Sequence, residues 1–133
     1  MSQENVEIVR EGYLAFNRGD FEAVLATLDP DVEFDLSRRT FDPAVYRGHE
    51  GVRENLSLMA EQWATMRFEP QDFIVAGDDI VIVPVHFIGV GKHSGVETTA
   101  NPAHVSTFRN GKIIRQTTFQ TLGEALEAVG LSE

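Results

Sequence analysis

Two ionisable side chains in this sequence, His104 and Asp35, are of the types that move protons in small buried sites. His104 lies in the alternating segment AHVSTF, shortly before an Asn-Gly pair. Because an imidazole titrates near neutral pH, a His104 that faces a pocket can donate a proton to a bound molecule or accept one from it. The alternative is a histidine buried against one polar partner, or one on a strand that faces water.

Asp35 stands at the end of the short alternating segment DVEFDL. A carboxylate in that position commonly accepts hydrogen bonds from nearby backbone amides. In an apolar cavity, by contrast, desolvation would raise the pKa of the carboxyl group toward that of a useful general base. Asp35 and His104 are therefore a candidate acid/base pair across a pocket.

The Asn-Gly pair determines the neighbours that we expect for His104. A two-residue turn of this type joins antiparallel strands and pairs the residues on either side of it. Counting outward places on one face of the hairpin the pairs Phe108 with Ile113, Ser106 with Arg115 and His104 with Thr117, followed by Phe119. Arg115 could hold a carboxylate or enolate oxygen through two hydrogen bonds, or it could reach solvent near the hairpin tip.

Three N-terminal helices are predicted from apolar residues that recur every three or four positions. The first covers residues 4–18 and ends at Gly19, and the second begins after Asp20, a good helix cap. The third begins near His49 and carries the stripe Val52, Leu56, Met59, Trp63 and Met66. Between the second and third helices, DVEFDL is predicted as a strand, and an aperiodic loop follows it over residues 37–48.

From Phe68 onward the apolar period changes to two, which predicts strands. We expect one strand over FEPQDFIVAG, a long one over DIVIVPVHFIGVGK, and two more over residues 95–109 and 112–120. Thr121 and Glu124 have the spacing of a capping box and open a short C-terminal helix. The long strand is apolar on both faces, so the helices should cover one face and a second subunit the other.

This order of elements predicts an α+β fold, with the helices collected on one side of an antiparallel sheet and a short helix at the C-terminus. A sheet that curves strongly around the long helix would leave a cavity between them. The aromatic side chains that could line it, although each would serve equally well in a plain core, are Tyr13, Phe16, Trp63, Phe87 and Phe119. Tyr46, on the loop before the third helix, could cover its mouth.

Composition narrows the classes of partner. The length fits one domain over residues 1–133, and a formal net charge of −10 with scattered basic residues argues against binding to nucleic acid or to an anionic membrane. The chain has no cysteine and no recognisable signal peptide, so we expect a cytoplasmic protein. His49, His86 and His93 lack partners at metal-ligand spacing, and no phosphate-binding loop is present, so we expect neither a metal nor another cofactor.

Four segments, in order, resemble the SnoaL-like branch of the nuclear-transport-factor-2-like superfamily. They are NRGDFEAVLATLDPDVEF, YRGHEGVRENL, HVSTFRNGKIIRQTTF and EALEAVGL. The resemblance extends from Glu4 to Leu131 and implies a cone of curved sheet and three helices around a pocket, in proteins that are usually dimers. Its members include polyketide cyclases, ketosteroid isomerases, scytalone dehydratases, limonene-epoxide hydrolases and many proteins without an assigned activity, so the fold alone does not specify a reaction.

The resemblance implies that the curved mixed or antiparallel sheet wraps around the N-terminal helices as an α+β barrel or cone. It also turns the hairpin face of His104 inward, so that Phe108, Arg115, Thr117 and Phe119 would contact a ligand, and it implies roles for single residues. Asp35 corresponds, with an offset of one residue, to the proton-abstracting Asp of ketosteroid isomerases, and His104 falls where those enzymes place a protonated Asp that donates a hydrogen bond to the substrate. Their helix-one tyrosine corresponds to Gly12, with Tyr13 beside it. The catalytic Asp that SnoaL-type cyclases carry at the last strand has no counterpart here, because no Asp follows Arg109.

These observations favour two functions for the chain. One is a cofactor-independent isomerase, cyclase, dehydratase or hydrolase that acts on an apolar small molecule, with Asp35 as the base or orienter of a water and His104 as the donor to an oxyanion. The other is a non-catalytic dimeric module that binds a hydrophobic small molecule. A structural dimer whose core is filled is the third possibility. An outward-pointing Asp35 would contradict the enzyme as formulated.

Overall fold

The computed structural model describes residues 2–39 and 42–131. Thr40 and Phe41 of the predicted loop lie outside the described residues. The helices of this part of the chain are α1 (Ser2–Asn17), α2 (Phe21–Ala26), α3 (Gly48–Gln62) and α4 (Leu122–Ala128). None of them is both long enough and apolar enough to cross a membrane.

Helix boundaries follow from local chemistry at the residues predicted to set them. Gly19 adopts a left-handed conformation (φ 77°) directly after α1, where a side chain would cost energy. The Asp20 carboxylate accepts a hydrogen bond from the Ala23 amide and caps α2. Thr121 caps α4 in the same way, through the Glu124 amide at 3.1 Å. These caps satisfy amides that have no partner within the helix.

The strands form one mixed sheet. They are β1 (Leu28–Asp35), β2 (Val45–Arg47), β3 (Trp63–Pro70), β4 (Ile74–Ala76), β5 (Ile80–Gly91), β6 (Glu97–Ala100), β7 (Ala103–Arg109) and β8 (Lys112–Phe119). The strand order is β2-β1-β8-β7-β5-β3, with β4 and β6 also paired to β5. The pairing of β1 with β8 is parallel and the other pairings are antiparallel.

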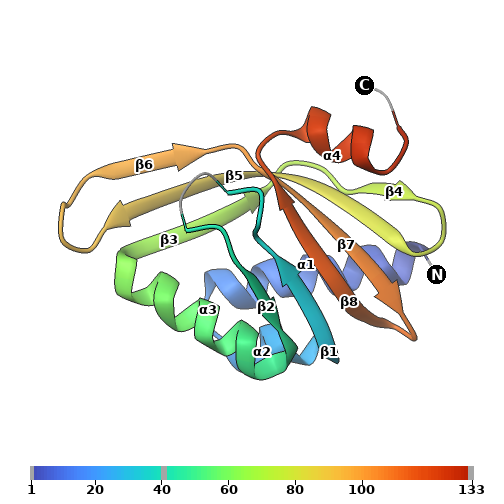
Figure 1. Cartoon of the computed structure of the whole chain (residues 1–133), viewed down its shortest axis with the longest axis horizontal. Coiled ribbons are helices and arrows are strands. Elements are labelled where there is room, and N and C mark those ends of the chain that lie inside the picture. The colour runs from blue at the N-terminus through green and yellow to red at the C-terminus, as the bar shows by residue number, and fades with distance from the viewer. Residues whose placement is uncertain (1, 40–41, 132–133) are drawn as a thin grey trace.

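The sheet bends along β5, the longest strand. Its first half pairs with β4 and β7, and its second half pairs with β3 and β6. Pro84, which cannot donate a ladder hydrogen bond, lies where β5 changes partners. The helices α1, α2 and α3 lie inside the resulting curve, whereas α4 packs on the opposite face (Figure 1).

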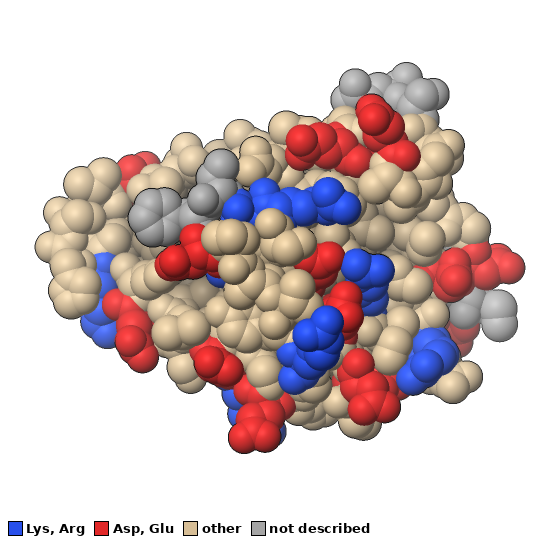
Figure 2. Space-filling model, viewed as in Figure 1, with Lys and Arg blue, Asp and Glu red and all other residues tan. Residues whose placement is uncertain are grey.

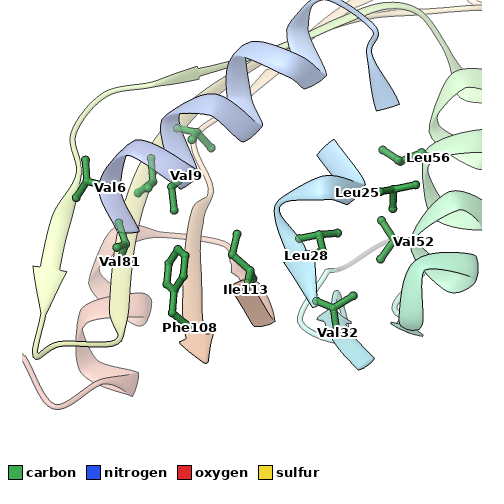
Figure 3. Packing of buried hydrophobic residues seen from close by; sticks show 12 residues of the cluster. Val6, Val9, Leu25, Leu28, Val32, Val52, Leu56, Val81, Phe108 and Ile113 are labelled. Atoms are coloured by element: carbon green, nitrogen blue, oxygen red, sulfur yellow. The ribbon is translucent and has the colours of Figure 1, made fainter. Parts of the chain in front are cut away.

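The main hydrophobic core lies between α1 and the curved sheet. Val6 and Val9 of α1 point toward Val81, Phe108 and Ile113 on three strands (Figure 3). A second part of the same cluster joins α2 and α3 to β1 through Leu25, Leu28, Val32, Val52 and Leu56. The first half of the apolar stripe of α1 is therefore buried in the core, and Tyr13 and Phe16 of its second half pack against the core while partly buried.

The predicted fold class is confirmed, and three details of the elements are corrected. Trp63 and Met66 lie on β3 rather than on the third helix, because the backbone is already extended at Trp63 (φ −117°, ψ 127°). A short run of apolar residues spaced by three fits either structure at a helix end. The strand predicted over 95–109 is two strands, separated at Pro102, and the strand predicted over 68–77 is divided in the same way.

Candidate functional site

A cavity of about 630 Å³ lies between the helices and the concave face of the sheet. Apolar and aromatic side chains make up most of its wall, among them Val9, Phe16, Leu28, Phe34, Leu36, Leu56, Met59, Trp63, Phe68 and Phe87. A cavity of this size and character fits a drug-sized organic molecule. The interior of the domain is therefore not completely filled, in contrast to the structural dimer with a filled core that was the third possibility.

Aromatic rings form one end of the cavity wall. Phe87 packs against Trp63 with ring centroids 5.2 Å apart and against Phe68 at 5.0 Å. Gly89 makes this possible, since a Cβ atom there would lie 2.7 Å from both Phe87 and Trp63. Asn17 fixes Phe68 in turn, because its side-chain amide bonds the Phe68 carbonyl at 2.7 Å and the Phe68 amide at 3.0 Å.

Tyr13 and His104 form the central polar group of the cavity. The Tyr13 hydroxyl lies 2.7 Å from Nδ1 of His104, although the two residues are 91 positions apart in the sequence. Their rings are nearly parallel, at an interplanar angle of 8°, and Phe68 packs against the imidazole at 5.3 Å. Helix α1 and strand β7 thus bring together a phenol and an imidazole at hydrogen-bonding distance within an apolar enclosure.

Burial keeps both members of this pair uncharged. Desolvation lowers the pKa of His104 from 6.5 to about 4, and it raises the pKa of Tyr13 far above its ordinary value. No charged side chain among the described residues offsets this effect on either group. The pair is therefore neutral at physiological pH.

The second ring nitrogen of His104, Nε2, has no hydrogen-bond partner among the described residues. His104 is only 6% exposed, and the sole hydrogen bond of its ring there joins Nδ1 to Tyr13. Because His104 lines the cavity, a molecule bound there is the partner that Nε2 can take.

The hairpin that carries His104 differs from the predicted one by a β-bulge. Its turn has the expected left-handed residues, Asn110 (φ 53°) and Gly111 (φ 77°), and Phe108 pairs with Ile113 as predicted. Ile114 is then an extra residue, so that Ser106 pairs with Gln116 and His104 with Thr118.

This shift of one residue turns two predicted ligand contacts away from the cavity. Arg115 and Thr117 lie on the opposite face of β8, and neither is among the described residues that line the cavity. Gln116 and Thr118 take the inward positions. The guanidinium of Arg115 instead pairs with Glu33 at 3.3 Å and with Asp35 at 3.0 Å.

Asp35 also points away from the cavity, which corrects the predicted acid/base pair. Its neighbours Phe34 and Leu36 line the cavity, and Asp35 alternates to the other face of β1. There it accepts hydrogen bonds from the Ser37 hydroxyl at 2.5 Å and amide at 3.0 Å, and it pairs with Arg115. Hydrogen bonds from Ser37, together with Arg115, lower the pKa of this carboxyl group, so it is an ionised structural group and a weak base.

The remaining predicted residues divide between the cavity and its surroundings. Those that line the cavity are Tyr13, Phe16, Trp63, Phe87 and Phe119. Phe108 packs in the hydrophobic core beneath α1 and is not among the described residues of the cavity wall. Tyr46 lies on β2, where it pairs with Phe34 of β1, and it is not among the described residues of the cavity wall. It therefore does not cover the mouth of the cavity as expected.

Several polar cavity residues were not predicted. Gln116 and Thr118 depend on the bulge, which no turn residue signals, and Arg39 lies in the aperiodic loop after β1. Asn55, by contrast, was recognisable, since it interrupts the apolar stripe of Val52 and Leu56 on α3. Asn55 is buried and bonds weakly with Met59 at 3.8 Å.

The cavity residues do not resemble a metal centre. Across residues 2–39 and 42–131, no group of three or more His, Asp or Glu side chains is arranged to hold a metal ion. The polar side chains of the wall carry hydroxyls, amides, an indole N–H, one imidazole, one guanidinium and the single carboxylate of Asp42. Such groups bind organic molecules by hydrogen bonds.

Comparison with known proteins places this geometry in a family. The sequence profile described as the SnoaL-like domain matches residues 9–116. The chain belongs to the SnoaL-like family. No curated protein matches the sequence significantly.

Solved structures of SnoaL-like and related proteins agree with the fold. TerC, in a crystal structure with polyporic acid, has 26% identity and a TM-score of 0.79 over 95% of this chain and 98% of its own. A putative polyketide cyclase from Xanthomonas campestris pv. campestris has 26% identity and a TM-score of 0.74, over 97% and 98% of the two chains. A protein of ketosteroid isomerase-like fold from Catenulispora acidiphila, in complex with trimethylamine, has 18% identity and a TM-score of 0.77 over 94% and 93%, which shows the fold alone.

Proposed function

We propose that this SnoaL-like protein binds a small, largely apolar organic molecule in its cavity and holds an oxygen atom of that molecule with the Tyr13–His104 pair. The observation that carries the proposal is a neutral imidazole that lines an apolar cavity of about 630 Å³ and whose Nε2 has no hydrogen-bond partner among the described residues. Related structures that contain small molecules, such as TerC with polyporic acid, support binding of this general kind.

The pair can present hydrogen-bonding groups to a ligand in two ways. If the Tyr13 hydroxyl donates to Nδ1, Nε2 carries the proton and donates to a carbonyl oxygen of the ligand. If Nδ1 donates to the hydroxyl oxygen, Nε2 accepts a hydrogen bond and the phenol proton is free for the ligand. A carbonyl ligand selects the first arrangement and a hydroxyl ligand the second.

Acid/base catalysis is the second candidate function, and the same Nε2 atom, without a partner in the described chain, is the observation that favours it. The base would be His104 rather than Asp35, because Asp35 is ionised on the other side of the sheet. A neutral imidazole can accept a proton from an acidic carbon, and Tyr13 can hold the imidazolium that forms. The low pKa of His104, about 4, makes it a weak base, which is why binding is the primary proposal.

The test uses neutral aromatic ketones, such as 2-acetylnaphthalene, as probes of the cavity. We expect isothermal titration calorimetry to detect binding to the wild type. His104→Leu should weaken it about tenfold, because the ketone oxygen loses a hydrogen bond in an apolar site. The control is Asp35→Asn, which removes a carboxylate outside the cavity and should leave the affinity unchanged.

Two outcomes would decide against parts of this proposal. If no ketone of the panel bound the wild type, the Tyr13–His104 pair would not hold the oxygen of a neutral carbonyl ligand. If binding were lost in Asp35→Asn but kept in His104→Leu, the ligand would lie on the other face of the sheet. Catalysis is distinguished from binding by proton exchange at the α-carbon of the ketone, which is measured as the incorporation of deuterium from heavy water.

A further inference from the structure

Arg39 is the only basic side chain that lines the cavity among the described residues. It lies in the loop after β1, where its amide bonds the Leu36 carbonyl at 3.2 Å. One end of its guanidinium, Nη2, donates to the Asp42 carbonyl at 2.6 Å. The Nε atom is fully enclosed and lacks any hydrogen-bond partner within the described chain.

This arrangement distinguishes Arg39 from the other arginines of the chain. Those that pair with Asp or Glu carboxylates are Arg10, Arg18, Arg47, Arg53, Arg67, Arg109 and Arg115. Arg38 instead packs over the Phe119 ring, with its guanidinium carbon 4.8 Å from the ring centroid. Arg39 has no carboxylate within ion-pair distance in the described chain, and a buried donor without an acceptor is unfavourable.

The strand register places Arg39 across the cavity wall from His104. His104 on β7 pairs directly with Thr118 on β8. Strand β1 runs parallel to β8 with Asp35 opposite Thr117, so the next residue of β1, Leu36, lies beside Thr118. Arg39 follows Leu36 by three residues. His104 and the start of the Arg39 loop are thus separated by two strand spacings, about 10 Å, which one two-ring or three-ring molecule can span.

We propose that the molecule held in this cavity is an organic anion, whose charged oxygen pairs with the Arg39 guanidinium while a second oxygen reaches the Tyr13–His104 pair. The ligand class is an apolar, ring-containing body that bears a carboxylate or an ionised enol. This inference rests on the proposed function and specifies the chemistry of the ligand. The Arg39 guanidinium lines the cavity and, within the described chain, donates only to the Asp42 carbonyl, so an anionic oxygen in the cavity can accept from an N–H group at its outer end.

The surrounding charges oppose an anion only weakly at this position. Asp42 also lines the cavity, but its side chain is exposed, and only its backbone carbonyl contacts Arg39. The groups that give the chain its formal charge of −10 lie mostly at the surface. At physiological salt their electrostatic effect on the cavity is screened over about 10 Å. A direct charge-assisted bond in an apolar enclosure outweighs both effects.

The experiment compares matched acids and amides on the folded, full-length chain. Pairs such as 2-naphthoate with 2-naphthamide, together with biphenyl and anthracene analogues, have the same shape but differ in charge. We expect calorimetry at neutral pH to show at least one acid binding the wild type about tenfold or more tightly than its amide. Arg39→Gln should remove this preference, Arg39→Lys should keep part of it, and Arg53→Gln, which makes the same charge change on an exposed pair, should keep all of it.

Each outcome either supports the inference or overturns it. Equal binding of acids and amides to the wild type would overturn the anion site and leave the proposed small-molecule function intact. A preference for acids that survives in Arg39→Gln, in a protein whose thermal unfolding is unchanged, would also overturn it. Failure of every acid, amide and neutral ketone to bind would reject the proposed function and this inference with it. The wild-type comparison does not depend on the folding of any variant.

Discussion

The Tyr13–His104 pair shows how a protein of this size can hold a polar group in an apolar cavity without a charge. Each member satisfies one hydrogen-bonding atom of the other, and each is kept neutral by desolvation. Phe68 packs on the imidazole and is held in place by Asn17 of α1. The position of the imidazole in the cavity wall therefore depends on α1, β3 and β7 together.

The first prediction concerns the pH dependence of stability. The folded pKa of His104 is about 4 and its ordinary value is 6.5, so the unfolded chain takes up a proton at higher pH than the folded one. Stability from this group is complete above pH 6.5 and declines as the pH falls toward 4, by about 3 kcal/mol in all. Urea unfolding across this range should show the loss in the wild type and its absence in His104→Gln, which retains an acceptor for Tyr13. Parallel curves for the two proteins would contradict a buried neutral histidine.

The second prediction assigns Asp35 to stability rather than to ligand binding. Asp35→Asn removes the ion pair with Arg115 and weakens the bonds from Ser37 at a position that is 7% exposed. We expect the free energy of unfolding to fall by about 1–3 kcal/mol. Chemical denaturation measures this change, and Arg115→Gln should reproduce part of it. A variant as stable as the wild type would show that the Asp35 contacts contribute nothing net.

At the scale of elements, one bulge decides which residues of β8 face the cavity. Residue patterns were sufficient to predict the existence of the helices and the Asn110–Gly111 turn, because these depend on local spacing, whereas the curvature of the sheet was predicted from the family resemblance. The inward row of β8 was predicted wrongly, since the extra residue at Ile114 reverses the alternation and no Gly marks it. Asp35 was misassigned for a different reason. The segment DVEFDL alternates, with Phe34 on one face and Asp35 on the other, and it was the resemblance to ketosteroid isomerases, with its offset of one residue, that placed Asp35 in the pocket.

The third prediction tests the role of glycine in the aromatic wall. Gly89→Ala places a methyl group 2.7 Å from the rings of Phe87 and Trp63, so these rings must shift and the unfolding free energy should fall by about 1–3 kcal/mol. Gly12→Ala on α1 is the matched control, because its nearest neighbour is Thr27 at 3.9 Å and helix propensity favours Ala by about 0.5–1 kcal/mol. Thermal unfolding and the near-ultraviolet circular dichroism of Trp63 report both changes. Destabilisation by both substitutions would show that the effect is not specific to the wall.

At the scale of the whole molecule, the surface charge and the outer face of the sheet determine which partners the protein can bind. Figure 2 shows acidic and basic side chains interspersed on one face, without a continuous basic stripe there. On the sheet, α4 covers Ile82, Val105 and Phe119, so part of the second apolar face is hidden within the chain and needs no second subunit. A second subunit is therefore expected only against the half of β5 that lies beyond Pro84.

The fourth prediction is that the chain forms a homodimer through this remaining outer face. Ile88 and Val90 alternate onto it, opposite Phe87, and both are only half-buried in the single chain. Their neighbours on β3 and β6 include Thr65 and Thr99, which gives the mixed polarity of a non-obligate interface. Sedimentation velocity across a dilution series should show a species of twice 14.8 kDa.

Ile88→Glu separates this interface from the cavity. A charge in the centre of the buried patch should shift the sedimentation profile to the monomer, because an unpaired carboxylate would have to be desolvated on association. The affinity for the neutral ketone should stay the same, since Ile88 is not among the described residues of the cavity wall. A wild type that stays monomeric at every concentration would contradict the dimer, and a dimer that Ile88→Glu leaves intact would place the interface elsewhere.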